Sequence, residues 1–216
     1  SLLVNVPSVS PPINNALKAL IIADPAPDLR LPGAEAEGHR LREIFTEMKA
    51  KLEGKIDLQF QTRIGPGECD LVKILSLIFN EEFDLIHFAG HGSFDAENPT
   101  NSGWVFGKDR ILSANEIFRL RRVPRLVFAN ACFSGTLPTT ESNSQLAGLA
   151  EAFFRQGIEN YIGTGWAVDD EHAVNFAETF YRQVLDKGEM LGTALSDARN
   201  TIWAGGNNQI TRPDST

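Results

Sequence analysis

Five apolar segments of strand length recur along the chain and alternate with longer amphipathic segments. They occupy residues 16–23, 56–63, 83–89, 125–131 and 160–165. Strands separated by connections this long are typical of parallel pairs joined by crossover helices. The third and fourth segments are apolar almost throughout, as expected of central strands that are buried on both faces. The sequence therefore predicts an α/β fold with a mainly parallel central sheet.

Helical periodicity marks the segments between these strands. Apolar residues recur at helical spacing from about Glu35 to Leu52, and Gly54 ends the pattern. A second helix is predicted after residues 65–70. Residues 102–113 predict a small hairpin, and a capped helical turn follows it. Three more helices are expected at 145–156, 170–187 and 190–203.

The length and the ends of the chain predict its domain organisation. The 216 residues suffice for one substantial core, so we expect a single domain over residues 16–203. Residues 1–15 and 204–216 are rich in Pro, Asn, Gly and Ser, which predicts an N-terminal linker and a C-terminal tail, or the cut ends of a longer protein.

Composition argues against several classes of function. A net charge of −8 and the absence of a basic stripe beyond residues 119–122 argue against direct nucleic-acid binding. No apolar stretch is long enough to span a membrane, and the first residues lack the pattern of a signal peptide, so we expect a cytoplasmic protein. Two cysteines without metal-ligand spacing predict neither a disulfide framework nor a metal site, and we expect no cofactor.

A histidine and a cysteine follow the two strands that we expect at the centre of the sheet. His91 comes after the run 83–89, and Cys132 comes after the run 125–131. Ligands of open parallel sheets bind beyond the carboxyl ends of the strands, where neighbouring strands lie about 4.8 Å apart. A thiol has an ordinary pKa of about 8.5, and an imidazole that takes its proton makes it a nucleophile. The backbone N–H groups of Gly92 and Cys132 are then natural donors to an oxyanion.

Structural roles are the alternative for each of these residue types. A lone histidine after a strand is more often structural, and a buried cysteine is more often inert. His87 lies inside the apolar run and is expected to pack in the core, while His39 and His172 lie on predicted helices. Cys69 stands between two acidic residues without a basic neighbour, so we expect it to be unreactive.

Three sequence motifs resemble those of one known family, and they occur in the same order and at similar spacing. FDLIHFAGHG (83–92), ANACFSG (129–135) and YIGTGWAVDDEHAVNFAETFYRQVL (161–185) are similar to motifs of the CHAT family, bacterial relatives of caspases and separase. The segment PGAEAEGHRLREIF (32–45) resembles the first-helix signature of the caspase fold. The resemblance covers roughly residues 16–203 and implies a caspase-like three-layer α/β/α sandwich.

The resemblance also implies residue roles. His91 and Cys132 would form the catalytic dyad of a cysteine endopeptidase that works through a thioester, and Gly92 and Cys132 would form the oxyanion hole. A specificity pocket would lie beneath Asn130, walled by residues 165–170 with Trp166 among them. The segment 133–146 is short and lacks Asp, which argues against a caspase-style cut into two subunits.

The acidic residues near this pocket suggest a substrate preference. Separase cuts after arginine and has an Asp in a segment similar to 165–170, and a carboxylate can pair with a guanidinium through two hydrogen bonds. We therefore expect Arg, then Lys, before the scissile bond, with Asp170 as the main determinant and Asp169 as the second. The alternative is that both aspartates cap the following helix and that Trp166 lines an apolar pocket for Met or Leu.

Three classes of function remain open at this point. The first is an endopeptidase that acts on a protein or peptide substrate and is regulated by a partner or an attached sensor domain, since CHAT domains often follow such modules. The second is a non-catalytic caspase-fold interaction module, although both His91 and Cys132 are present. The third is another thiol acyl enzyme, such as a small-molecule amidase.

Overall fold

The computed structural model describes residues 16–95, 97–117, 119, 123–133, 150–151, 153–155, 157–163 and 170–206. Seven strands within these ranges form one sheet. They are β1 (Ala16–Ala23), β2 (Asp57–Ile64), β3 (Leu85–Ser93), β4 (Gly103–Gly107), β5 (Arg110–Ser113), β6 (Leu126–Phe133) and β7 (Asn160–Gly163). The helices are α1 (Pro32–Lys51), α2 (Leu71–Asn80), α3 (Ala114–Ile117), α5 (Asp170–Tyr181) and α6 (Leu191–Gly206), with a 3₁₀ turn at Pro99–Asn101 and a π-helical turn at Arg182–Asp186.

Five strands are parallel neighbours and build the body of the sheet. β1 lies between β2 and β3, and β6 lies between β3 and β7. β3 and β6 are therefore central neighbours, as predicted from their uninterrupted apolar runs. The only antiparallel pairs among the described strands are β3 with β4 and β4 with β5. The prediction of a mainly parallel sheet is confirmed.

β3 changes its neighbour on one side shortly before His91. The pairing of β1 with β3 ends at Ala23 and Ala89, where the backbone N–H of Asp24 donates to the Ala89 carbonyl at 2.9 Å. Further along, β3 pairs with β4 at Gly92 and Ser93. The chain leaves the sheet at Asp24, so the segment after β1 lies next to this end of β3.

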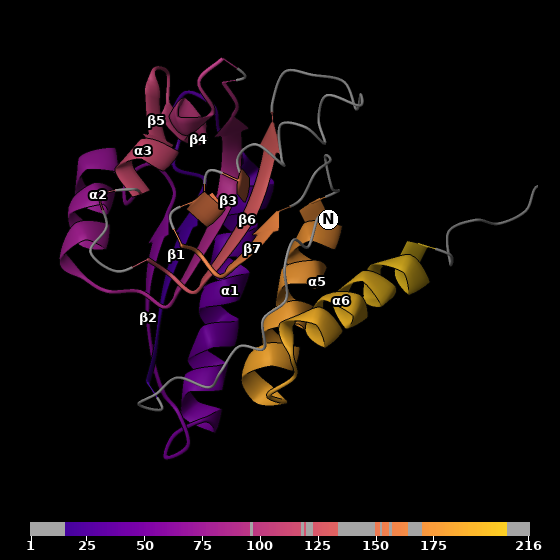
Figure 1. Cartoon of the computed structure of the whole chain (residues 1–216). Helices are drawn as coiled ribbons and strands as arrows, with labels where there is room; N and C mark the ends of the chain where they lie inside the picture. The colour runs from indigo at the N-terminus through magenta and orange to yellow at the C-terminus, as the bar shows by residue number, and fades with distance from the viewer. Residues whose placement is uncertain are drawn as a thin grey trace, which may run out of the picture.

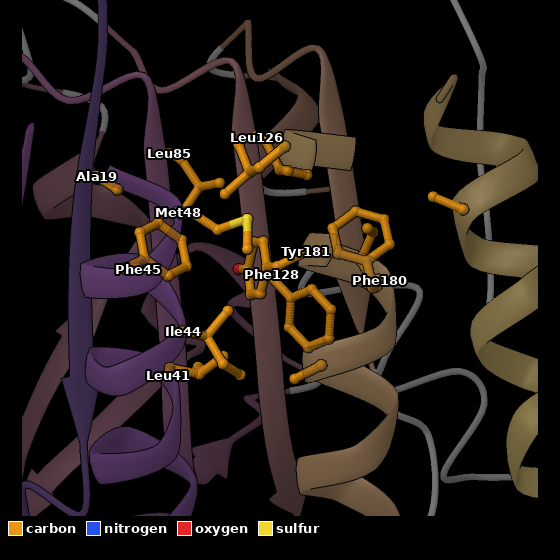
Figure 2. Packing of buried hydrophobic residues seen from close by; sticks show 14 of the residues in the cluster. Ala19, Leu41, Ile44, Phe45, Met48, Leu85, Leu126, Phe128, Phe180 and Tyr181 are labelled. Atoms are coloured by element: carbon orange, nitrogen blue, oxygen red, sulfur yellow. The ribbon is translucent and has the colours of Figure 1, made fainter. Parts of the chain in front are cut away.

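Helices cover both faces of the sheet (Figure 1). Alternate strand residues divide into two cores, as the two-residue period of a strand requires. On one face Ile21 and Phe128 pack against α1, α5 and α6, and on the other face Ile22 and Phe88 pack against α2. Figure 2 shows Phe45, Phe128, Phe180 and Tyr181 in the first of these cores. The three-layer α/β/α sandwich is thus confirmed.

The packing of α1 on β1 requires a glycine. A Cβ atom at Gly38 would lie 2.4 Å from the Cβ atom of Ala23, so a larger residue would force the helix away from the strand. This close approach brings the first half of α1, including the buried Glu37, against the sheet. The helix thereby contributes to the polar groups described below.

Most predicted elements are found, with shifted ends. α1 begins at Pro32, before the expected Glu35, because proline is well tolerated in the first turn of a helix. The predicted helix 170–187 is α5 followed by the π-helical turn, and α6 continues to Gly206, past the expected end at residue 203. The hairpin is confirmed as β4 and β5, and α3 follows it, with the Glu116 carboxylate accepting from the Ser113 N–H at 2.7 Å.

Candidate active site

The register of the two central strands pairs the two candidate catalytic residues directly. In the parallel ladder of β3 and β6, His91 is the Cα partner of Cys132, and Gly92 is the partner of Phe133. The sequence predicted both residues just past the strand ends, whereas the strands continue through them to Ser93 and Phe133. The ladder therefore places the backbones of His91 and Cys132 on adjacent strands, where the spacing is about 4.8 Å.

The His91 ring is held by a backbone carbonyl. Its Nε2 atom lies 3.0 Å from the Leu29 carbonyl oxygen, in the segment between β1 and α1. Because a carbonyl only accepts, Nε2 must carry the hydrogen, and in the neutral ring Nδ1 then keeps its lone pair. Nδ1 is buried and has no hydrogen-bond partner among the residues that the structure describes. This atom is therefore suited to accept a proton.

Asn130, which is half-buried, contacts a row of buried polar groups under this edge of the sheet. Its Nδ2 atom donates to Glu37 Oε2 at 2.7 Å, and Glu37 Oε1 lies 3.1 Å from His87 Nε2. His87 Nδ1 lies 3.0 Å from the Tyr181 hydroxyl oxygen. Glu37, His87 and Tyr181 are at most 1% exposed. The row connects β6, α1, β3 and α5.

His87 has the structural role that the sequence predicted. Its ring is fully buried and stacks on Phe128 with a centroid distance of 4.8 Å. Burial, and secondarily the negative charge of Glu37, raises the pKa of Tyr181 well above its ordinary value, so its hydroxyl keeps its proton at neutral pH. His87 is thus held between two groups of the core and is separate from the His91 and Cys132 pair.

Cys69 is a buried thiol in the core that contains α2. Its Sγ atom donates to the Arg63 carbonyl at 3.1 Å, and burial raises its pKa to about 12. A thiol with this pKa is protonated at neutral pH and is a poor nucleophile. This environment agrees with the prediction that Cys69 is unreactive.

Several predicted site residues are only partly placed. Trp166 and Asp169 lie outside the described residues, and only the backbones of Cys132 and Asp170 are described. Asp170 is the first residue of α5, a position compatible both with a pocket wall and with a helix cap. The roles of Gly92 and Cys132 as oxyanion donors stay predictions.

The other histidines and acidic residues form no second centre in the described ranges. His39 lies on α1 with its Nδ1 atom 2.9 Å from Arg42 Nη2, and His172 lies on α5. Within the described part of the chain, no group of three His, Cys, Asp or Glu side chains is arranged to hold a metal ion. No helix of that part has the length and apolar character needed to cross a bilayer.

Sequence reasoning missed two contributors to this site. Leu29 acts through a backbone carbonyl, which leaves no trace in residue type. Glu37 lies in the quoted helix segment 32–45, but its contacts with Asn130 and His87 depend on how α1 packs on the sheet. A charged residue at a core-facing helical position was the one available signal.

Comparison with known proteins agrees with this architecture. Residues 2–214 match the CHAT domain. A protein of Vitiosangium sp. (strain GDMCC 1.1324) named as a probable protease is 27% identical over 135 residues, which are 59% of this chain. The chain spans only 17% of the length of that relative. Because the domain match covers almost all residues and the sheet has the topology expected of a caspase-like sandwich, the chain belongs to the CHAT domain family of caspase-like peptidases.

Proposed function

We propose that this chain is a cysteine endopeptidase domain in which His91 and Cys132 form the catalytic dyad. The observation that carries the proposal is the ladder that makes these two residues cross-strand partners. The Leu29 carbonyl supports it, because it holds the proton on Nε2 and leaves Nδ1 as a base. The relative named as a probable protease points to the same class of reaction.

The two-residue period of a strand allows His91 and Cys132 to lie on the same face of the sheet. Residues 128, 130 and 132 of β6 share one face by the two-residue period, and Phe128 and Asn130 contact residues of α1 or α5 on that face. Residues 87 and 91 of β3 share a face in the same way, and His87 also contacts α5. We therefore assign His91 and Cys132 to the same face of the sheet.

The reaction that we propose balances as a two-step acyl transfer. His91 Nδ1 takes the thiol proton of Cys132, and the thiolate attacks the carbonyl carbon of the scissile peptide bond. The N–H groups of Gly92 and Cys132 stabilise the oxyanion, and His91 returns the proton to the leaving amine as the C–N bond breaks. Water then attacks the thioester with His91 as base, which releases the carboxylate product and restores the thiol.

Four substitutions test the dyad. Cys132→Ala is expected to abolish proteolysis without changing the fold, and His91→Ala is expected to lower activity strongly. Cys69→Ala and His87→Ala are the matched controls, because neither residue belongs to the proposed dyad.

Clear outcomes would contradict the dyad. Activity of Cys132→Ala above about one-thousandth of the wild type would exclude a nucleophilic role. A folded His87→Ala protein as inactive as His91→Ala would show that the histidines are misassigned. Failure of iodoacetamide or a peptidyl electrophile to label Cys132 would favour a non-catalytic interaction module. Labelling of Cys132 without cleavage of any protein substrate would favour an amidase.

For the substrate, we propose a basic residue before the cleaved bond, Arg in preference to Lys. Asp170 is the main determinant in this proposal, and Asp169 and Trp166 complete the pocket near Asn130. The carboxylate of Glu37, which contacts Asn130, adds negative charge on that side. A substrate-library profile of the wild type and of Asp170→Asn tests the preference. Cleavage mainly after Met, Leu or Asp, or an unchanged Arg preference in Asp170→Asn, would contradict it.

We also propose regulation by a partner or an attached sensor domain. The support is the much greater length of the probable protease, of which this chain spans 17%. Loops that complete a catalytic site are commonly ordered by a partner in switchable enzymes. The isolated domain should therefore be weakly active compared with a longer protein and its activator. Full activity of the isolated domain would contradict this part of the proposal.

A further inference from the structure

The orientation of His91 depends on the segment between β1 and α1, residues 24–31, which we call the β1–α1 loop. Leu29, whose carbonyl accepts the Nε2 hydrogen, has a side chain that is 43% exposed. The Leu29 side chain therefore does little to anchor this carbonyl. Other groups of the β1–α1 loop must keep the carbonyl in place.

Asp24 is buried at the start of the β1–α1 loop, and its side chain hydrogen-bonds to residues at the end of the loop. Its side chain is 1% exposed, and its carboxylate accepts from the Leu31 N–H at 2.8 Å and from Arg30 Nε at 2.5 Å. Its own N–H donates to the Ala89 carbonyl of β3 at 2.9 Å. Asp24 thus joins the far end of the loop to the strand that carries His91.

The conformation of Asp24 fits this role. Its φ of 47° lies in the left-handed region, which Asp and Asn tolerate better than most other residues. A buried carboxylate is costly unless it is hydrogen-bonded, and both oxygens of Asp24 have donors. Arg30, one of these donors, also pairs with Glu35 of α1 at 2.5 Å. The position of the Asp24 carboxylate is therefore fixed by its contacts with Arg30 and Leu31.

A second carboxylate holds the loop on its outer side. Asp28 accepts from the Lys108 N–H at 2.7 Å, in the turn between β4 and β5. Leu29 therefore lies between Asp28, which is attached to the hairpin, and Arg30, which is attached to Asp24. The loop is fixed on both sides of the carbonyl that contacts His91.

We infer that Asp24 is a positioning residue for His91, acting through the β1–α1 loop and the Leu29 carbonyl. Asp24 fixes the loop so that the Nε2–H of His91 donates to the Leu29 carbonyl, which leaves Nδ1 of His91 free to accept a proton. Without it the carbonyl shifts, the ring turns or adopts the other tautomer, and the thiol of Cys132 loses its base. This inference rests on the proposed dyad.

Asp24→Asn is the variant that tests the inference. It keeps the size and the tolerance of positive φ but removes the negative charge that binds Arg30. Asp84→Asn is the matched control, because Asp84 also accepts a backbone N–H, that of Lys18 at 2.9 Å, and lies just before β3, at the end opposite His91. If Asp24→Asn does not fold, Arg30→Gln tests the same contact from an exposed residue.

The readout is the pH at which alkylation of Cys132 by iodoacetamide reaches half its maximal rate, followed by mass spectrometry. Pairing with His91 should place this midpoint below about 8.5, the value of a free thiol. We expect Asp24→Asn to raise the midpoint by about one pH unit, because part of the thiolate stabilisation by imidazole is lost. Asp84→Asn should leave it unchanged even where the two variants lose similar thermal stability. Nitrogen NMR of His91 should show the Nε2–H tautomer in the wild type and a mixture in Asp24→Asn.

His91→Ala separates failure of this inference from failure of the dyad. If His91→Ala raises the midpoint and Asp24→Asn does not, the dyad stands and Asp24 has no positioning role. If His91→Ala leaves the midpoint unchanged, the dyad is wrong and the inference falls with it. An equal shift in Asp84→Asn would also overturn the inference, because it would reveal a general effect of lost stability.

Discussion

The chain has two tyrosines, and their buried hydroxyls differ in hydrogen bonding. The Tyr181 hydroxyl lies 3.0 Å from His87 Nδ1, and both side chains are fully buried. The Tyr161 hydroxyl is also buried, but it has no hydrogen-bond partner among the described residues. Replacing each tyrosine with phenylalanine therefore measures the value of one buried hydrogen bond against a control of the same chemistry.

The expected cost of Tyr181→Phe follows from the groups left behind. Losing a neutral hydrogen bond costs about 1 kcal/mol net, and leaving the His87 nitrogen buried without a partner adds about the same, so we expect about 2 kcal/mol. For a domain of this size, that corresponds to a fall in Tm of about 4–8 °C. Tyr161→Phe removes a buried hydroxyl without breaking a bond, so we expect a change within about 0.5 kcal/mol or a gain in stability.

Urea denaturation followed by circular dichroism tests the comparison. The free energy of unfolding is compared between variants at unchanged m-value, so that a change in midpoint reports stability. Equal losses for the two variants, or a larger loss for Tyr161→Phe, would refute the reasoning. Such a result would mean that the hydrogen bond between Tyr181 and His87 contributes nothing beyond the burial of a hydroxyl.

Four further substitutions address glycines in two helices, a helix cap and the buried thiol. Gly38→Ala should destabilise the fold by about 2 kcal/mol or more, because the new Cβ would lie 2.4 Å from the Cβ of Ala23. Gly192→Ala is the matched control, because a Cβ at Gly192 would have no atom within 4 Å, and it should stabilise the fold by up to about 1 kcal/mol. Both values are measured by urea denaturation. Asp70→Ala should lower the free energy of unfolding by about 1 kcal/mol, since the Asp70 carboxylate caps α2 by accepting from the Lys73 N–H. The variant should therefore lose its helical circular dichroism signal at a lower temperature than the wild type. Burial raises the pKa of Cys69 to about 12, well above the ordinary thiol value of about 8.5. The Cys69 thiol therefore loses its proton at a lower pH in the unfolded chain than in the folded one, and stability should fall as pH rises between these two values. Cys69→Ala should flatten that alkaline decline in urea midpoints measured at successive pH values, and an unchanged decline would contradict the assignment.

Much of the fold could be predicted from the chain because a strand buried on both faces needs an unbroken apolar run. The first predicted strand, 16–23, has the bounds that the structure shows for β1, and the predicted hairpin is present as β4 and β5. Long amphipathic connections made parallel pairing the expected arrangement. These features depend on local composition and spacing, which the sequence carries directly.

The candidate site needed both kinds of information. Residue types and position after apolar runs singled out His91 and Cys132, but nothing local states that β3 and β6 are neighbours or that the ladder continues to these two residues. Register is set by the packing of whole strands against α1, α2 and α5, which involves residues far apart in the chain.

Residue identity by itself determined the candidate catalytic groups, a thiol and an imidazole at the ends of two buried strands. Only the tertiary structure decided what holds them. The Leu29 carbonyl reaches His91 because Asp24 closes the β1–α1 loop, and Glu37 reaches Asn130 because Gly38 lets α1 approach β1. A backbone carbonyl and a buried contact between distant segments leave no pattern in the sequence, since their position depends on how the layers pack.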